Sequence, residues 1–160
     1  MKNKIYLDTS IPSAYLDFSK PVRQLITQKW LEIESKNYSL YISTLTMVEI
    51  NRTKKDSKKN TINNLINEYN CRQLEINEEA IELSKKYITH GAIPPKEVEN
   101  SLHIAIATVN KITLLASWNF RHIVSINPII KINQINNKFN HCSIQIGTLE
   151  IFVGSKYGKL

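Results

Sequence analysis

Asp8 is the first residue of this chain whose type and position could carry chemistry. It directly follows the apolar run Ile5-Tyr6-Leu7, which predicts a short buried strand, and it precedes Thr9 and Ser10, which are favourable helix N-cap types. With Pro12 just inside the predicted helix, Asp8 lies where a strand ends and a helix begins. In an open α/β sheet, ligands bind at this edge, outside the carboxyl ends of the strands. The alternative is that Asp8 only caps the following helix.

Polar side chains occur near the ends of predicted elements at three further places. They are Glu49, on the helix after a strand at 39–43; Asn100 and His103, in the first half of the helix before a strand at 113–117; and Trp118-Asn119-Phe120-Arg121-His122, directly after that strand. If the strands are parallel, all these positions converge with Asp8 on one edge of the sheet.

The elements that must position these residues alternate along the chain. Apolar runs predict strands at 4–8, 39–43, 74–76 and 113–117, a short extended piece at 123–126, and late strands at 144–146 and 149–153. Helical spacing and cap residues predict helices at 10–17, 21–35, around Glu49, through 62–69, from Asn77 to 89, at 96–110 and at 129–137. Alternating strands and helices favour parallel pairing with right-handed crossovers. We therefore expect an α/β fold, with one domain over residues 1–160 and a parallel sheet of about four to five strands.

Length and composition agree with a single globular domain. The chain has 160 residues, of which 42% are hydrophobic and 22% charged, enough for one substantial core. Its longest apolar runs are far shorter than a membrane span, and the apolar stretch behind the basic N-terminus is too short for a signal-peptide core, so we expect a cytoplasmic protein with no membrane association. Cys71 and Cys142 have no CxxC spacing, so neither a zinc site nor a disulfide framework is indicated.

The charge balance favours a polyanionic partner. The formal net charge is +7, although chains rich in Lys and Asn also arise from base-composition bias. The basic run 52–60 is typical of a solvated loop or helix face, and the alternative is an edge that contacts phosphates beside the site.

Four stretches carry a resemblance to a known family. They are Ile5-Tyr6-Leu7-Asp8-Thr9-Ser10, Tyr41-Ile42-Ser43 leading to Glu49-Ile50, Leu102-His103-Ile104-Ala105-Ile106-Ala107, and Leu115-Ala116-Ser117-Trp118-Asn119-Phe120-Arg121-His122-Ile123. In this order and over the whole chain, the sequence resembles the PIN-domain nucleases, the fold of many VapC-like toxins of bacterial and archaeal toxin–antitoxin pairs. The resemblance implies an acidic pocket that binds Mg²⁺ or Mn²⁺ and hydrolyses phosphodiester bonds in RNA.

Carried over by position, the pocket consists of Asp8, Glu49, Asn100 and Asn119. Asn119 is a residue type that the family commonly has at its position, whereas Asn100 stands where the family usually has a third aspartate. Mg²⁺ prefers oxygen ligands, so Asp8 would bind it directly, Glu49 would bind it through water or act as a base, and Asn100 would offer a carbonyl oxygen without charge. The resemblance thus implies metal ligands Asp8, Glu49 and Asn100, with activity reduced by the missing acid.

Neighbouring residues leave several roles open. Glu99 could replace the missing acid, but adjacent helical residues point about 100° apart, so this needs a local shift. His103 shares a helical face with Asn100, and a structural hydrogen bond is the simpler role for it than a ligand or an acid. Thr9 and Ser10 could donate to Asp8 or to a phosphate, although capping is simpler, and Arg121 could contact a phosphate.

Three functions fit these observations. The leading one is a Mg²⁺/Mn²⁺-dependent, toxin-like endoribonuclease of PIN type; the alternative is a catalytically impaired PIN-fold module that binds RNA or protein. A structure-specific DNA nuclease is less favoured, because the chain lacks the insertions that such enzymes need. The family also implies a cognate antitoxin and often a homodimer, neither of which this sequence locates.

Overall fold

The strand β1 (Asn3–Leu7) lies at the centre of a parallel sheet in the computed structural model, which describes residues 1–154. Within those residues the sheet has five strands in the order β3-β2-β1-β4-β5. The other strands are β2 (Tyr38–Ser43), β3 (Arg72–Leu74), β4 (Leu114–Ala116) and β5 (Gln145–Gly147). Ile5 of β1 pairs with Leu40 on one side and with Leu114 on the other, so the carboxyl ends of the three central strands share one edge. The predicted α/β class and strand number are confirmed.

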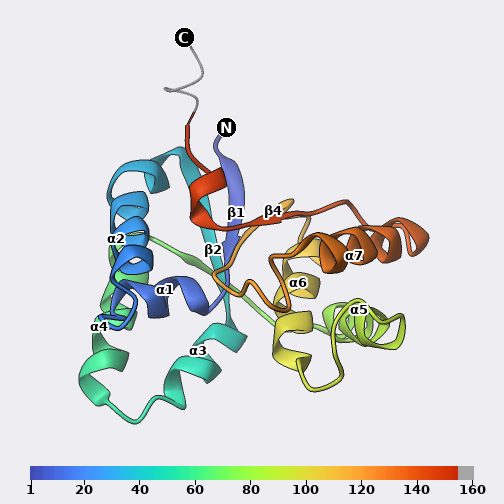
Figure 1. Cartoon of the computed structure of the whole chain (residues 1–160), viewed down its shortest axis with the longest axis horizontal. Helices are drawn as coiled ribbons and strands as arrows, with labels where there is room; N and C mark the ends of the chain where they lie inside the picture. The colour runs from blue at the N-terminus through green and yellow to red at the C-terminus, as the bar shows by residue number, and fades with distance from the viewer. Residues whose placement is uncertain (155–160) are drawn as a thin grey trace.

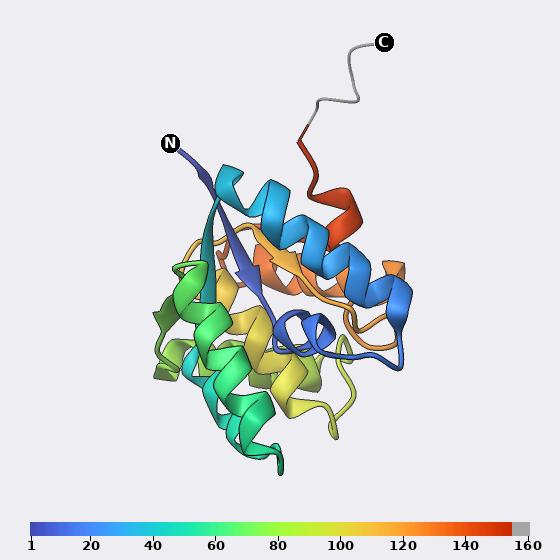
Figure 2. The same cartoon turned by 90° about the vertical axis from the view of Figure 1, so that its left-hand side faces the viewer.

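Helices cover both faces of this sheet. They are α1 (Ser10–Tyr15), α2 (Pro21–Lys29), α3 (Thr44–Asn51), α4 (Asp56–Glu68), α5 (Glu78–Thr89), α6 (Val98–Val109) and α7 (Ile126–Lys138). Figure 1 shows α1, α2 and α4 on one side and α5, α6 and α7 on the other, while α3 extends from the end of β2. Figure 2 shows α2 and α4 lying across the face of the sheet that is turned to the viewer.

Strand alternation divides the core into two layers. Ile5 and Leu7 pack with Trp30 and with the α1 and α4 side, whereas Tyr6 packs with the α5, α6 and α7 side. Successive side chains of a strand point to opposite faces, and a parallel sheet covered by helices on both faces buries both sets. The apolar run before Asp8 is therefore buried throughout, which fixes the direction in which Asp8 leaves the sheet.

Local signals explain where several helices begin and end. Pro21 occupies the first turn of α2, and the Asn77 side chain accepts a hydrogen bond from the Ala80 N–H at 2.9 Å to cap α5. After α4, α5, α6 and α7 the chain adopts a left-handed conformation, at Asn70, Gly91, Lys111 and Asn140 respectively. This conformation reverses the chain direction after a helix, and it suits Gly and Asn better than Lys.

Several predicted elements differ from the structure. The segment 123–125 is a turn and bend rather than a strand, Ile126 already begins α7, and 149–153 contains the 3₁₀ helix η3 (Leu149–Ile151). η3 folds back against β5 because Gly147 leaves room for it: a Cβ at Gly147 would lie 2.1 Å from Cδ1 of Ile151. The strand expected at 74–76 pairs instead over Arg72–Leu74, and the helix begun at Pro21 changes after Lys29 into a π-helical turn, η1 (Trp30–Glu34).

Candidate functional site

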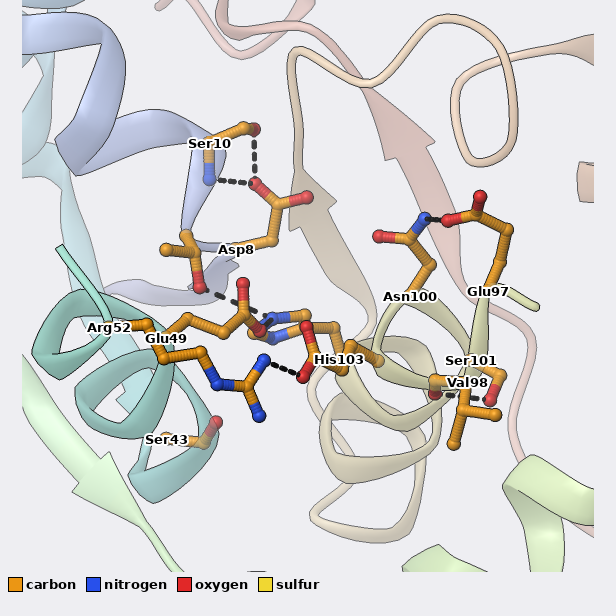
Figure 3. A network of polar contacts seen from close by, with 12 residues as sticks. Asp8, Ser10, Ser43, Glu49, Arg52, Glu97, Val98, Asn100, Ser101 and His103 are labelled. Atoms are coloured by element: carbon orange, nitrogen blue, oxygen red, sulfur yellow. Dashed lines mark hydrogen bonds and ion pairs between the residues drawn. The ribbon is translucent and has the colours of Figure 1, made fainter.

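Asp8 is a buried carboxylate at the carboxyl end of β1, with 3% of its surface exposed. Its Oδ1 accepts hydrogen bonds from the Ser10 backbone N–H, at 3.0 Å, and from the Ser10 hydroxyl. Ser10 Oγ also accepts from the Trp118 N–H at 2.8 Å, which ties Asp8 to the loop after β4. Asp8 thus caps the start of α1 through one oxygen, while Figure 3 shows the other oxygen turned toward Asn100. Asp8 can therefore cap the start of α1 and still offer its second oxygen to a ligand.

Burial raises the pKa of the Asp8 carboxyl above its usual value, because a low-dielectric environment disfavours the charged form. The nearby His103 and hydrogen bonds from Ser10 and Ser117 oppose this shift. A buried carboxylate is stabilised in its charged form by a cation placed beside it. A cation bound beside Asp8 would therefore lower the pKa of this carboxyl.

Glu49 is held by a chain of buried polar groups that crosses from α3 to β1. Its Oε1 lies 2.7 Å from Nε2 of His103, Nδ1 of His103 lies 2.6 Å from the Tyr6 hydroxyl, and that hydroxyl lies 2.8 Å from Ser43 Oγ. Thr9 Oγ1 is a weaker neighbour of Nε2, at 3.3 Å. The Tyr6 side chain is fully buried and His103 almost so, which fixes both rings. His103 thus has the structural hydrogen-bonding role that was the simpler expectation.

The direction of these hydrogen bonds follows from their chemistry. An ionised Glu49 carboxylate can only accept, so Nε2 of His103 carries the hydrogen. In the neutral ring Nδ1 then accepts from the Tyr6 hydroxyl, which in turn accepts from Ser43. Burial raises the pKa of Tyr6, so this hydroxyl keeps its proton and remains a donor.

Asn100 has a partner that sequence reasoning missed. Its Nδ2 donates to Oε2 of Glu97 at 2.7 Å, and Oε1 of Glu97 lies 3.5 Å from Nε2 of His122. A carboxylate accepts hydrogen bonds, so the amide NH₂ must face Glu97, and the Asn100 carbonyl oxygen is left on the Asp8 side, as Figure 3 shows. Glu97 precedes Asn100 by one helical turn, and this i, i+3 spacing was the signal that could have identified it.

Glu99, the suggested replacement for the missing acid, is engaged elsewhere. Its carboxylate pairs with the guanidinium of Arg52 at the end of α3. Both side chains are substantially exposed, 62% for Arg52 and 40% for Glu99. Exposed pairs of this kind stabilise a fold only weakly, by about 0–1 kcal/mol. The pair therefore joins α3 to α6 beside Glu49 without supplying a third acid to the pocket.

The loop after β4 brings the remaining predicted residues to the same edge. Asn119 mainly shapes this loop: its Oδ1 accepts from the His122 N–H and its own N–H donates to Ser117 Oγ, each at 3.0 Å. Asn119, Arg121 and Ser10 line a common cleft, and Arg121 is exposed there. Two of the three expected substrate-contacting residues, Ser10 and Arg121, thus share this cleft, whereas Thr9 contacts His103 instead.

The donor set fits a hard divalent cation, although with little charge. Asp8 and Glu49 supply carboxylate oxygens and Asn100 a carbonyl oxygen, which are the ligand types that Mg²⁺ and Mn²⁺ prefer. Over residues 1–154 no three or more His, Cys, Asp or Glu side chains are grouped as a metal site. With asparagine at position 100, this candidate donor set has three oxygen ligands, of which two, Asp8 and Glu49, are carboxylates.

Two searches for related sequences gave no match. No protein-family model matches the chain, and no curated protein does so.

Within residues 1–154, none of the helices combines the length and the apolar character needed to cross a bilayer.

Solved structures do match. One is a chain of VapBC2 from Rickettsia felis, determined with a DNA fragment from the promoter, which superimposes with a TM-score of 0.58 at 14% identity and covers 90% of this chain and 98% of its own. Another is VapC20 of Mycobacterium tuberculosis, described as a toxin that cleaves the Sarcin-Ricin loop, with a TM-score of 0.58 at 10% identity over 74% of this chain and 92% of its own. At such identities the likeness establishes the fold. The chain therefore has the PIN-domain fold that these VapC structures represent.

Proposed function

We propose that this protein is a toxin-like endoribonuclease of PIN type that depends on Mg²⁺ or Mn²⁺ and works at reduced rate because Asn100 replaces an acid. One observation carries the proposal: buried Asp8 faces the Asn100 carbonyl oxygen at the carboxyl edge of the sheet, beside Glu49. The fold supports it, since a protein of the same fold is described as an RNA-cleaving toxin.

The chain's own residues divide the work. Asp8 and the carbonyl oxygen of Asn100 would hold the cation, which when bound polarises a phosphate and lowers the pKa of a water molecule. Glu49 would accept a proton from the attacking water, and its bond to His103 fixes the carboxylate for that task. Arg121 would contact a phosphate of the RNA. Two carboxylates would bind one divalent cation only weakly, so oxygen atoms of a substrate phosphate would complete its coordination.

The test combines Mn²⁺ titration by calorimetry with cleavage of a mixed RNA pool. We expect Asp8→Ala to abolish Mn²⁺ binding and to lower cleavage at least about a hundredfold, because a metal ligand is lost. The matched control is Glu79→Ala, which removes an exposed carboxylate from the first turn of α5 and should change neither. RNA cleavage that is indifferent to Asp8, Mg²⁺ and Mn²⁺ would overturn the proposal.

A second function is favoured by Asn100 itself. With two charged ligands, the fold could bind RNA or protein without cleaving it. This alternative predicts that the wild-type chain binds RNA equally well in EDTA and in Mn²⁺ and leaves the pool intact in both. Cleavage by the wild type, lost in Asp8→Ala, excludes it.

We also propose an antitoxin partner, since the VapBC2 chain of the same fold comes from a two-component complex. The cheapest test is to look directly upstream for a short open reading frame with a DNA-binding pattern. Co-expression of its product should then suppress any growth arrest that this chain causes. A homodimer remains a prediction, and light scattering of the purified protein tests it.

A further inference from the structure

A cleft of about 480 Å³ opens directly beside Asp8, between α1, α2, the start of α4 and the loop after β4. Its lining includes Asn119 and Ser10, whose hydroxyl donates to Asp8. Its volume lies within the range of roughly 300–1,000 Å³ that is typical of ligand sites. The proposed function uses one cation of this lining, Arg121, and leaves the other basic and aromatic residues of the cleft without a role.

The cleft is strongly basic. Its lining includes Lys20, Arg23, Lys58 and Arg121, against a single acid, Asp17. Asp17 is already engaged by the backbone N–H of Ser19 at 3.1 Å and by its hydroxyl. Clustered cations around a concave surface attract phosphate groups. Lys58 belongs to the basic run 52–60, so part of that run does face the site.

The floor of the cleft is aromatic and rigid. Trp118 is buried, and its Nε1 donates to Thr27 Oγ1 at 3.0 Å. The guanidinium of Arg23 lies 5.4 Å from the ring centroids of both Trp118 and Phe120, which holds it by cation–π contacts. Phe120 remains 52% exposed although Arg23 lies over its ring, so part of the ring is open to solvent beside the cations. An exposed aromatic ring next to a basic track is the arrangement on which unpaired bases stack.

We propose that this cleft binds single-stranded RNA next to the bond that is cut, with one unpaired base stacked on Phe120 and the adjoining phosphates held by Lys20, Lys58 and Arg121. The proposal rests on the proposed function for the identity of the nucleic acid. It goes beyond it in assigning Phe120 and the cations of this cleft as the groups that position the RNA. The RNA would therefore lie on the side of the site that α1 and α2 flank.

The test measures RNA binding in EDTA, where cleavage cannot interfere. Fluorescence anisotropy compares a short labelled single strand with the same strand annealed to its complement. We expect Phe120→Ala to weaken single-strand binding at least about fivefold, the lower end of what one stacked base contributes. Phe120→Tyr keeps the ring and should bind within about twofold of wild type. Ile126→Ala, which removes another exposed apolar side chain, is the matched control and should have no effect.

The charges are tested by salt titration. The double variant K20Q/K58Q should lower the slope of log K against log salt by about 1.4, since each phosphate contact with a single strand contributes about 0.7. The control K36Q/K85Q removes two exposed charges outside the cleft and should leave the slope unchanged.

Equal affinity for duplex and single strand, or wild-type affinity in Phe120→Ala and K20Q/K58Q, would overturn the subsite. If RNA is cut in Mn²⁺ but those variants bind normally, the ribonuclease proposal stands and the subsite fails. If the variants lose binding but no RNA is ever cut, the subsite stands and the ribonuclease proposal fails.

Discussion

Replacing Asn100 by aspartate tests the chemistry of the pocket most directly. The change supplies the acid that the family pattern has at this position, and we expect it to raise both Mn²⁺ affinity and RNase activity. The structure also indicates that the change lowers the stability of the fold. Position 100 lies against Glu97, whose Oε2 now accepts from the Asn100 amide at 2.7 Å. Asn100→Asp replaces that donor with a second carboxylate.

The size of this cost follows from the geometry. Two like charges about 4 Å apart repel by roughly 4 kcal/mol at an effective dielectric constant of 20. The Glu97 side chain is 26% exposed, so solvent screening and rotation away from each other reduce the repulsion to about 2 kcal/mol. For a chain of this size, that corresponds to a fall in Tm of about 4–8 °C in EDTA. A bound Mn²⁺ removes the repulsion, so the variant should gain more Tm from Mn²⁺ than the wild type does.

The assay is differential scanning fluorimetry in EDTA and in Mn²⁺, with calorimetry for affinity. The double variant N100D/E97Q is the matched control: its glutamine can donate to the new aspartate, so its Tm in EDTA should return to near the wild-type value. A Tm of N100D in EDTA equal to that of the wild type, or a loss that E97Q fails to relieve, would refute the assigned contact. Unchanged Mn²⁺ affinity in both variants would refute the role of position 100 as a ligand.

The remaining predictions concern groups that the fold buries around the site and the sheet. Tyr6→Phe should cost about 1–3 kcal/mol in urea unfolding, because Nδ1 of buried His103 loses its partner, and a loss below about 0.5 kcal/mol would contradict the assigned hydrogen bond. In the same variant RNase activity should fall, since the ring that fixes Glu49 is less constrained; Tyr69→Phe, at a partly exposed position, is the control. Burial raises the pKa of Cys71 to about 11 from 9.0, so its thiolate is depleted at neutral pH, and alkylation by iodoacetamide at pH 8 should be about a hundredfold slower than in the urea-unfolded chain. That ratio should shrink as the pH approaches 11; equal rates at pH 8 would show that the pKa of this thiol is not raised.

Local patterns in the sequence predict the frame of the site. Three apolar residues ending in Asp8, followed by cap residues, predict a strand-to-helix boundary, and the structure has one there. The order of elements predicts parallel pairing, which brings the ends of β1, β2 and β4 to one edge. These features follow from periodicity, capping and the geometry of crossovers, all of which act over a few residues or through chain connectivity.

Edge elements and turns were predicted less well, for physical reasons. β3 pairs over Arg72–Leu74 although Arg72 and Gln73 are exposed, because an edge strand is held by backbone hydrogen bonds and needs no apolar run. The segment after Gly147 looks like a strand by composition, but the missing side chain at that glycine allows the chain to fold back as η3.

The partners of the pocket residues were decided by tertiary structure. Nothing in the local pattern couples Glu49 to His103, 54 positions away, or His103 to Tyr6, 97 positions away. The packing of α2 against the loop after β4 likewise places Arg23 over Trp118, whereas the contact between Glu97 and Asn100 is local. The sequence alone thus predicts which acid begins the candidate site. Which groups surround Asp8, and what can reach it, depends on side chains far apart in the chain that only packing brings together.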